Sequence, residues 1–174
     1  MRTVNRRKPR APDTFVPPRV EISADGVAAF HNYDWYYRFM RSYLSARESV
    51  YLVPCAATKP IHRSPAHVRI YQRFAEFYGG SREILVVSEP VVLIRYGDLS
   101  ALEDAFCYDF PPRLLNAESR ALFVARLREL LDGKDVAGCL PAHHQSLVRE
   151  AIGNRWENHW ESGLYQMMKY AKSL

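Results

Sequence analysis

Short apolar runs alternate along the chain with longer stretches in which apolar residues recur every three or four positions. Three of the runs, at 50–53, 84–87 and 136–140, have the length and apolar content of buried strands. A fourth run, at 91–94, extends or directly follows the second. Strands that alternate with helices are typical of a parallel sheet covered on both faces. The pattern therefore predicts an α/β fold, a three-layer sandwich around a central and mainly parallel sheet.

The helical stretches carry clear start and stop signals. Ser64 and Pro65 supply an N-cap and a proline at the first helical position, and Asn116 caps a later helix. We expect helices at 34–44, from 65 to the Gly79–Gly80 pair, at 117–131, from about 145 to 152, and at 160–172. The aromatic residues of the first helix are interpreted as core residues rather than as a platform for stacking bases.

The N-terminal part of the chain differs from the rest. Residues 1–18 contain four prolines and most of the excess basic charge, which indicates a flexible basic arm rather than a helix. Residues 19–22 are compatible with an edge strand, followed by a turn at Asp25–Gly26 and a returning strand at 27–30. The remainder, 19–174, is expected to form a single α/β domain.

The net charge of +5 is concentrated in this arm. The first 13 residues carry five basic side chains and one acidic side chain, whereas the rest of the chain is nearly balanced. Such an arm either follows the phosphates of a nucleic acid or serves as a disordered, solubilising terminus. Charge alone does not decide between these two interpretations.

The cysteine content and the hydropathy of the chain indicate which cellular compartment to expect. Cys55, Cys107 and Cys139 are odd in number and far apart in sequence, which argues against a disulfide framework and favours a reducing cytoplasm. No apolar run approaches the roughly 20 residues that span a bilayer, so no membrane association is expected. The basic N-terminus lacks the apolar segment of a secretory signal.

The segment 54–67, which follows the first predicted strand, gathers several chemically useful side chains. Cys55 is a candidate nucleophile, Lys59 a candidate anion-binding cation, and His67 a candidate general acid or base. Each also has an ordinary interpretation: a small buried residue, a solvated loop lysine and a structural histidine. Ser64 serves first as a helix cap, and it can also contact a bound anion.

Two further chemical segments follow the other predicted strands. Ser88 and Glu89 come directly after the second strand, and residues 141–145 follow the third. Because the carboxyl ends of parallel strands meet at one edge of a sheet, these segments are expected to share a pocket with Cys55. Asp109, which follows Tyr108, is a second carboxylate able to accept the donor groups of a guanine-like base.

No metal site is predicted from the spacing of potential ligands. Cys55, His62 and His67 do not match a compact zinc spacing, and the sequence contains no paired cysteine motif. His143 and His144 are adjacent, so their rings are not expected to share one ion from a regular helix. The chain also lacks a glycine-rich phosphate loop, and no cofactor is predicted.

The spacing in this first segment resembles the signature of the catalytic core domain of archaeosine synthases. The resemblance rests on Pro54-Cys55, Lys59-Pro60, Ser64 and His67, with each interval preserved, and it extends over about residues 19–155. It implies a fold like that of uracil-DNA glycosylases. Ile61 departs from the pattern because the family usually has tyrosine there.

The resemblance implies amine addition to the nitrile of a 7-cyano-7-deazaguanine base in tRNA or DNA, which gives an archaeosine-type amidine. Cys55 is then the expected nucleophile, His67 transfers protons, and Lys59 supports the developing nitrogen anion. Pro54, Ser64, Ser88, Glu89 and Asp109 are expected to contact the substrate. The implied partners are the modified nucleic acid, an amine donor such as lysine, and a radical-SAM or transglycosylase protein.

Two other functions remain compatible with these residues. The chain can be a non-catalytic module that binds deazaguanine or nucleic acid and retains the pocket without its chemistry. It can also be a glycosylase-type enzyme, which the implied fold alone suggests. The full-length family carries additional transglycosylase-like and RNA-binding domains, for which these 174 residues have no room, and this leaves the polymer open.

Overall fold

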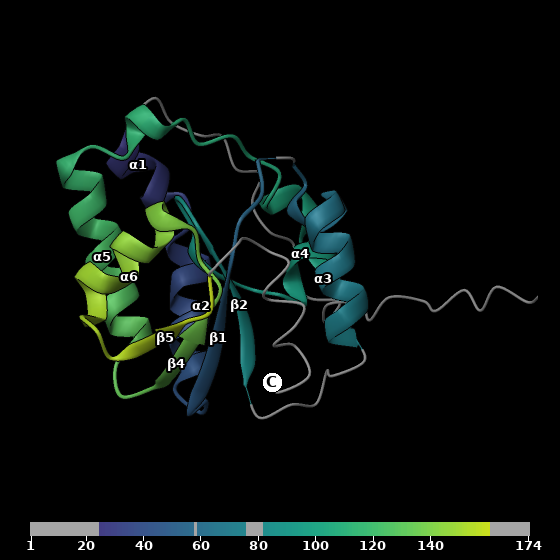
Figure 1. Cartoon of the computed structure of the whole chain (residues 1–174). Helices are drawn as coiled ribbons and strands as arrows, with labels where there is room; N and C mark the ends of the chain where they lie inside the picture. The colour runs from purple at the N-terminus through teal and green to yellow at the C-terminus, as the bar shows by residue number, and fades with distance from the viewer. Residues whose placement is uncertain (1–24, 58, 76–81, 161–174) are drawn as a thin grey trace, which may run out of the picture.

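The computed structural model describes residues 25–57, 59–75 and 82–160, and a five-stranded sheet lies at its centre (Figure 1). The strands are β1 (Ser49–Pro54), β2 (Glu83–Ser88), β3 (Val92–Arg95), β4 (Asp135–Gly138) and β5 (Trp156–Asn158). Their order in the sheet is β3-β2-β1-β4-β5. β1 pairs in parallel with β2 and β4, and β4 pairs in parallel with β5, whereas β3 is antiparallel to β2. The prediction of a mainly parallel sheet is confirmed.

Helices cover both faces of this sheet. They are α1 (Gly26–His31), α2 (Asp34–Leu44), α3 (Pro65–Ala75), α4 (Asp98–Ala101), α5 (Ala117–Leu131) and α6 (Ala142–Ile152), and short 3-10 turns lie at Ile61–Arg63, Glu103–Ala105 and Pro112–Leu114. Figure 1 shows the strands between α5 and α6 on one side and α3 and α4 on the other. This arrangement is the predicted α/β three-layer sandwich.

The strand and helix signals explain why these elements form. Residues 50–54 of β1 and 85–88 of β2 are buried, as expected for the centre of a sheet that is covered on both faces. The Asn116 side chain accepts a hydrogen bond from the Ser119 amide at the start of α5. Helix α2 buries Tyr36, Met40 and Leu44 in the core. Its other aromatic residues pack against the core except Phe39, which is exposed, so the interpretation as core residues holds for all but Phe39.

Two local predictions are wrong, and one strand was not predicted. Residues 27–30 belong to helix α1 rather than to a strand, because Asp25 caps the helix by accepting hydrogen bonds from the amides of Val27 and Ala28. Helix α6 begins at Ala142, three residues before the predicted start. The edge strand β5 carries no apolar run that would have revealed it. Four predictions lie wholly or mostly outside the described residues. They are the basic arm (1–18), the strand at 19–22, the end of the helix that starts at 65, and nearly all of the helix at 160–172.

The turn between β2 and β3 brings the chain back along the sheet. The run at 91–94 follows β2 as a separate antiparallel strand, with Val92 opposite Ser88. Val92 has a φ of 84°, which a β-branched residue rarely adopts. It is fully buried, so the surrounding core holds this backbone conformation in place. The turn lies directly beside the carboxyl ends of β2 and β1.

Candidate functional site

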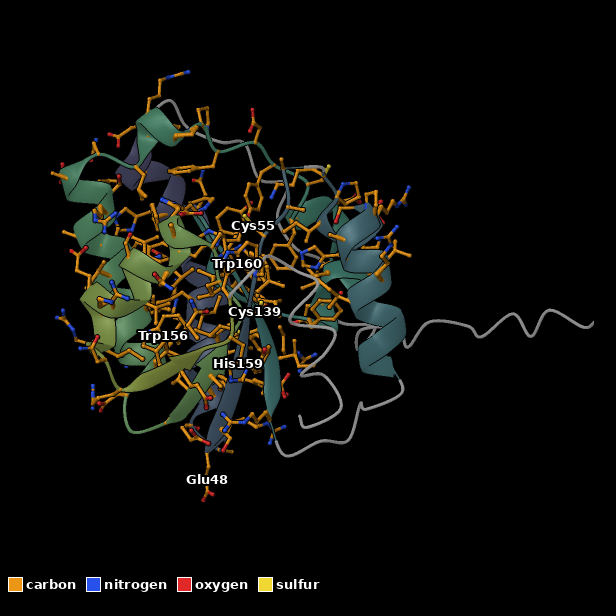
Figure 2. All side chains as sticks on the ribbon, viewed as in Figure 1. Glu48, Cys55, Cys139, Trp156, His159 and Trp160 are labelled. Atoms are coloured by element: carbon orange, nitrogen blue, oxygen red, sulfur yellow. The ribbon has the colours of Figure 1, made fainter. Side chains whose placement is uncertain are left out.

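The site lies at the carboxyl edge of the three central parallel strands. Figure 2 shows Cys55 at the end of β1 that is opposite Glu48. Because β2 and β4 flank β1 in parallel, the residues that follow them reach the same edge. The predicted convergence of the three segments after β1, β2 and β4 therefore holds in the structure.

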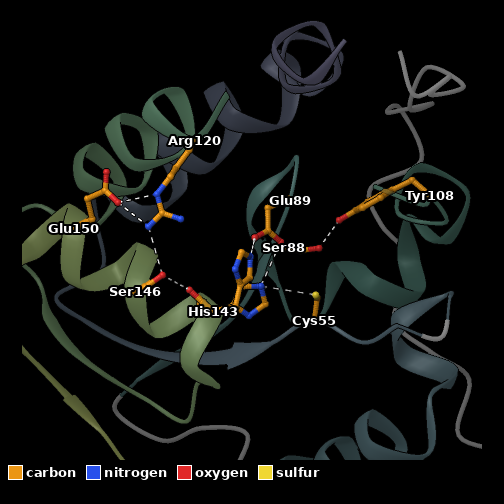
Figure 3. Close-up of polar contacts among 9 residues, drawn as sticks. Cys55, Ser88, Glu89, Tyr108, Arg120, His143, Ser146 and Glu150 are labelled. Atoms are coloured by element: carbon orange, nitrogen blue, oxygen red, sulfur yellow. Dashed lines mark hydrogen bonds and ion pairs between the residues drawn. The ribbon is translucent and has the colours of Figure 1, made fainter. Parts of the chain in front are cut away.

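Cys55, Glu89 and His144 form the centre of this site. Figure 3 labels Cys55 and Glu89 of this group. The Cys55 sulfur lies 3.9 Å from Nε2 of His144, and Oε2 of Glu89 lies 3.3 Å from the same nitrogen. The side chains of Glu89 and His144 are largely buried, and Cys55 is half-buried. A thiol, an imidazole and a carboxylate, each from a different strand end, are thus brought into contact.

His143 makes a second contact with the same carboxylate. Its Nε2 lies 2.6 Å from Oε1 of Glu89, and more than half of the His143 side chain is exposed. Glu89 therefore uses one oxygen for each of the two histidines. These contacts link a solvent-exposed imidazole to the buried one beside Cys55.

The first turn of α6, which carries both histidines, is tied to α5. The Ser146 hydroxyl donates to the carbonyl of His143, and Arg120 of α5 contacts both Ser146 and Glu150 (Figure 3). The backbone that carries the histidines is therefore anchored by a polar network on its outer side.

The charges of the site follow from these contacts. Burial raises the pKa of Glu89, but hydrogen bonds from His143 and His144 outweigh it and hold that pKa well below its usual range. Burial lowers the pKa of His144, but its contacts with Cys55 and Glu89 outweigh burial and raise it to about 9. At neutral pH, His144 is therefore an imidazolium between a carboxylate and a sulfur.

Lys59 is also half-buried and lies over the ring of Tyr108. Its ammonium group is 4.8 Å from the centre of the Tyr108 ring, within the range of a cation–π contact. Burial lowers the pKa of Lys59, and the nearby groups of Cys55, Glu89 and Asp109 oppose this effect. Lys59 is therefore within electrostatic range of Cys55 and Glu89.

Asp109 and Ser88, two further residues predicted to contact the substrate, differ in their exposure. Asp109 is exposed and within electrostatic range of Lys59, so it is accessible to a ligand. Ser88 is buried and hydrogen-bonds the Tyr108 hydroxyl at 2.5 Å. It therefore supports the aromatic ring beneath Lys59.

His67, Ser64 and Pro54 form a separate buried cluster, which we call the α3 cluster. Nε2 of His67 donates to the Pro54 carbonyl at 2.9 Å, and the His67 ring stacks on Tyr96. The Ser64 hydroxyl accepts from the amide of His67 at 3.2 Å, which confirms that Ser64 caps α3. In the contacts that the structure describes, the histidine beside Cys55 is His144, although the sequence had indicated His67.

The sequence placed the segment 141–145 at this pocket, but it gave His143 and His144 no role there. The predicted helix began at Gln145, whereas Pro141 is the N-cap of α6, and both histidines lie in its first turn. The proline was the available signal, because proline is frequent at helix starts. An earlier helix start would have turned both rings toward the carboxyl edge of the sheet.

No protein-family profile and no curated protein matches the chain. Among solved structures, the fold is similar to the crystal structure of AF0587, a protein of unknown function, with a TM-score of 0.52 and 15% sequence identity. The similarity covers 79% of this chain and 48% of that protein, so the chain spans about half of its length. At this level of identity the likeness supports the fold alone.

Within residues 25–57, 59–75 and 82–160, no helix combines the length and apolar character that a transmembrane span needs.

Proposed function

We propose that the protein is an enzyme that adds an amine to the nitrile of a 7-cyano-7-deazaguanine base in tRNA or DNA, with Cys55 as the nucleophile. The contact of the Cys55 sulfur with His144, which also contacts Glu89, carries the proposal. Together with the resemblance of the segment 54–67 to archaeosine synthases, it gives both a reactive group and a substrate class. The proposed product is an archaeosine-type amidine.

The contacts suit covalent chemistry at a nitrile carbon. The Cys55 thiolate adds to that carbon, one carbon–nitrogen π bond breaks, and the nitrogen takes the Nε2 proton of His144, which gives a thioimidate. The donor amine then adds to the same carbon and returns a proton to His144. Collapse of the adduct breaks the carbon–sulfur bond, releases the thiolate and leaves the amidine. Nitrile and amine supply every atom of the product, so the reaction needs no oxidant or reductant.

Proton transfer is assigned to His144 rather than to His67 for a physical reason. His144 is protonated at neutral pH and lies beside the sulfur, whereas burial lowers the pKa of His67 to about 4, although its bond to the Pro54 carbonyl opposes this shift. A general acid must carry a proton at the working pH and lie near the reacting atoms. Glu89 supports this role, because its carboxylate stabilises the imidazolium.

Lys59 and Asp109 supply the remaining functions. The Lys59 ammonium group lies within electrostatic range of Cys55 and Glu89, so it can stabilise negative charge that develops on the nitrile nitrogen. Because Glu89 is engaged by two histidines, the exposed Asp109 is the better candidate to accept the N1–H and the exocyclic amine of the base. The basic residues of the first 13 positions suit a nucleic-acid partner.

A non-catalytic base-binding module is the second candidate. Ile61 stands where the related signature usually has tyrosine, and it is buried in the core rather than available for stacking. A module of this kind would bind the nitrile-bearing base without changing it.

The experiment is mass spectrometry of nucleosides after incubation of nitrile-bearing tRNA or DNA with the protein and lysine. We expect a new amidine nucleoside with the wild type and a loss of at least about 10³-fold with Cys55→Ala, since the nucleophile is absent. Cys107→Ser, which alters an exposed thiol, is the matched control and should retain turnover. Full turnover by Cys55→Ala eliminates covalent catalysis, and tight binding without product supports the second candidate.

A further inference from the structure

Nε2 of His144 faces two partners at once. The Cys55 sulfur and the Glu89 carboxylate both contact this nitrogen, at 3.9 and 3.3 Å. In a serine-protease relay, the nucleophile and the acid contact opposite nitrogens of the imidazole ring. Here Nδ1 of His144 is buried and has no hydrogen-bond partner among the described residues. The three groups therefore surround a common point rather than forming a linear relay.

Two of the three separations between the donor atoms lie near those around a tetrahedral metal ion. Suitable donor atoms of Cys55, Glu89 and His144 all lie within 4.8 Å of one another. An ion with bonds of about 2.3 Å to sulfur and about 2.0–2.1 Å to nitrogen and oxygen separates its ligands by about 3.3–3.6 Å. The observed nitrogen–oxygen separation equals the lower value, and the nitrogen–sulfur separation exceeds the upper one by a few tenths of an ångström. The sulfur and the carboxylate oxygen lie within 4.8 Å of each other, so the sulfur moves toward both ligands when an ion binds.

We propose that Cys55, Glu89 and His144 form a binding site for one divalent ion of the Zn²⁺ type. A thiolate, an imidazole and a carboxylate are ligands that Zn²⁺ accepts, and three protein ligands leave the fourth position open for water or substrate. Because Cys55 is half-buried, that position is accessible from the mouth of the site. The spacing of potential ligands in the sequence predicted no metal site, and this proposal replaces that prediction.

His143 completes the site from outside. Its contact with the second oxygen of Glu89, at 2.6 Å, fixes the carboxylate that serves as a ligand. Partners of this kind orient a ligand and typically affect metal affinity by about 10- to 100-fold. Glu89 is thus held in a suitable orientation before an ion binds.

The expected effect of a bound ion on activity rests on the proposed function. A sulfur that is bonded to Zn²⁺ is not free to add to a nitrile carbon, so the ion should inhibit amidine formation reversibly. The same residues then serve two states of the protein, a metal-free active state and a metal-bound inactive state.

Titration of the chelator-treated full chain with Co²⁺ and Zn²⁺ tests the site without measuring activity. We expect one Co²⁺ per chain, the absorption of a tetrahedral ion with a thiolate charge-transfer band, and displacement of Co²⁺ by Zn²⁺. Cys55→Ser should abolish the thiolate band, and Glu89→Gln should weaken binding at least about 100-fold, since a ligand matters at least as much as its outer partner. His143→Gln should weaken it by about 10- to 100-fold. Cys107→Ser is the control and should bind as the wild type does, and circular dichroism checks the folding of each variant.

The two proposals fail separately. Amidine formation by a protein that binds no Co²⁺, or whose Co²⁺ spectrum is unchanged in Cys55→Ser, overturns the metal site alone. Metal binding with the expected spectrum, but without amidine formation by the metal-free protein, overturns the proposed function alone. Amidine formation that Zn²⁺ stimulates, rather than inhibits, overturns the inhibitory role.

Discussion

His67 and His144 occupy equivalent places in the fold but have opposite chemistry. Each is the third residue of a helix that follows a central parallel strand, with α3 after β1 and α6 after β4. His67 donates to a backbone carbonyl and stacks on Tyr96, and its pKa is lowered by burial to about 4. The pKa of His144 is raised to about 9, because its contacts with Cys55 and Glu89 outweigh burial.

The difference between the two histidines comes from their partners rather than from their place in a helix. The N-terminus of a helix disfavours a positive charge in its first turn, and burial does so as well. At α3, Ser64 satisfies an amide of the first turn, and the side chains whose charges act on His67 are the basic Lys59 and His62. At α6, the N-cap Pro141 offers no side-chain hydrogen bond, and the Glu89 carboxylate supplies the negative charge instead. The contacts with Cys55 and Glu89 thus distinguish His144 from His67.

The largest expected effect comes from exchanging the histidines for glutamine one at a time. His144→Gln keeps a hydrogen-bonding side chain beside Glu89 but removes the proton donor, so amidine turnover should fall by about 10²- to 10⁴-fold. His67→Gln should change turnover per folded molecule by no more than a few-fold, because the amide of the new glutamine side chain can still donate to the Pro54 carbonyl. Nucleoside mass spectrometry measures both rates. A large loss in His67→Gln with normal His144→Gln would reverse the comparison and restore the assignment of proton transfer to His67.

The second prediction concerns the dependence of stability on pH. Neutral His67 is favoured in the folded state, with a pKa of about 4 against an ordinary value of 6.5. Between these values the unfolded chain binds a proton that the folded chain does not, so this contribution is present above about pH 6.5 and is lost as the pH falls toward 4. The groups that face this ring are the Pro54 carbonyl, Tyr96, Lys59 and His62.

Urea unfolding at pH 7.5 and 4.5 measures this contribution in the wild type and in His67→Gln. The loss of unfolding free energy between the two pH values should be smaller in the variant by about 2–3 kcal/mol. Equal slopes for the wild type and His67→Gln would show that His67 is not held neutral by burial.

The sequence predicts the sheet and the edge at which the site lies better than it predicts the contacts between the side chains of the site. The apolar runs of β1 and β2 and the cap of α5 are local signals, so the sheet, its edge and the position of Cys55 followed from them. The pairing of Cys55 with His144 joins residues 89 positions apart and depends on where α6 begins. A spacing motif within one segment suggests a nearby partner for Cys55, such as His67. The sheet topology instead brings His144, which is distant in sequence, closer to Cys55. The same applies to Glu89, whose partners lie 54 and 55 positions away on α6.

The smallest effect is expected at Ser64, and it separates support of the α3 cluster from substrate binding. Loss of an N-cap costs about 1 kcal/mol, so Ser64→Ala should lower the unfolding free energy by that amount, and Ser64→Asp should restore most of it. Urea unfolding measures this change, and steady-state kinetics with nitrile-bearing RNA or DNA measures KM in the same variants. If Ser64 acts only through the helix, KM stays within a few-fold of the wild-type value. A raised KM in Ser64→Ala without a loss of stability would instead assign Ser64 to the substrate, as the sequence predicted. The structure favours the first result, because Ser64 is buried and its hydroxyl is bonded to the amide of His67.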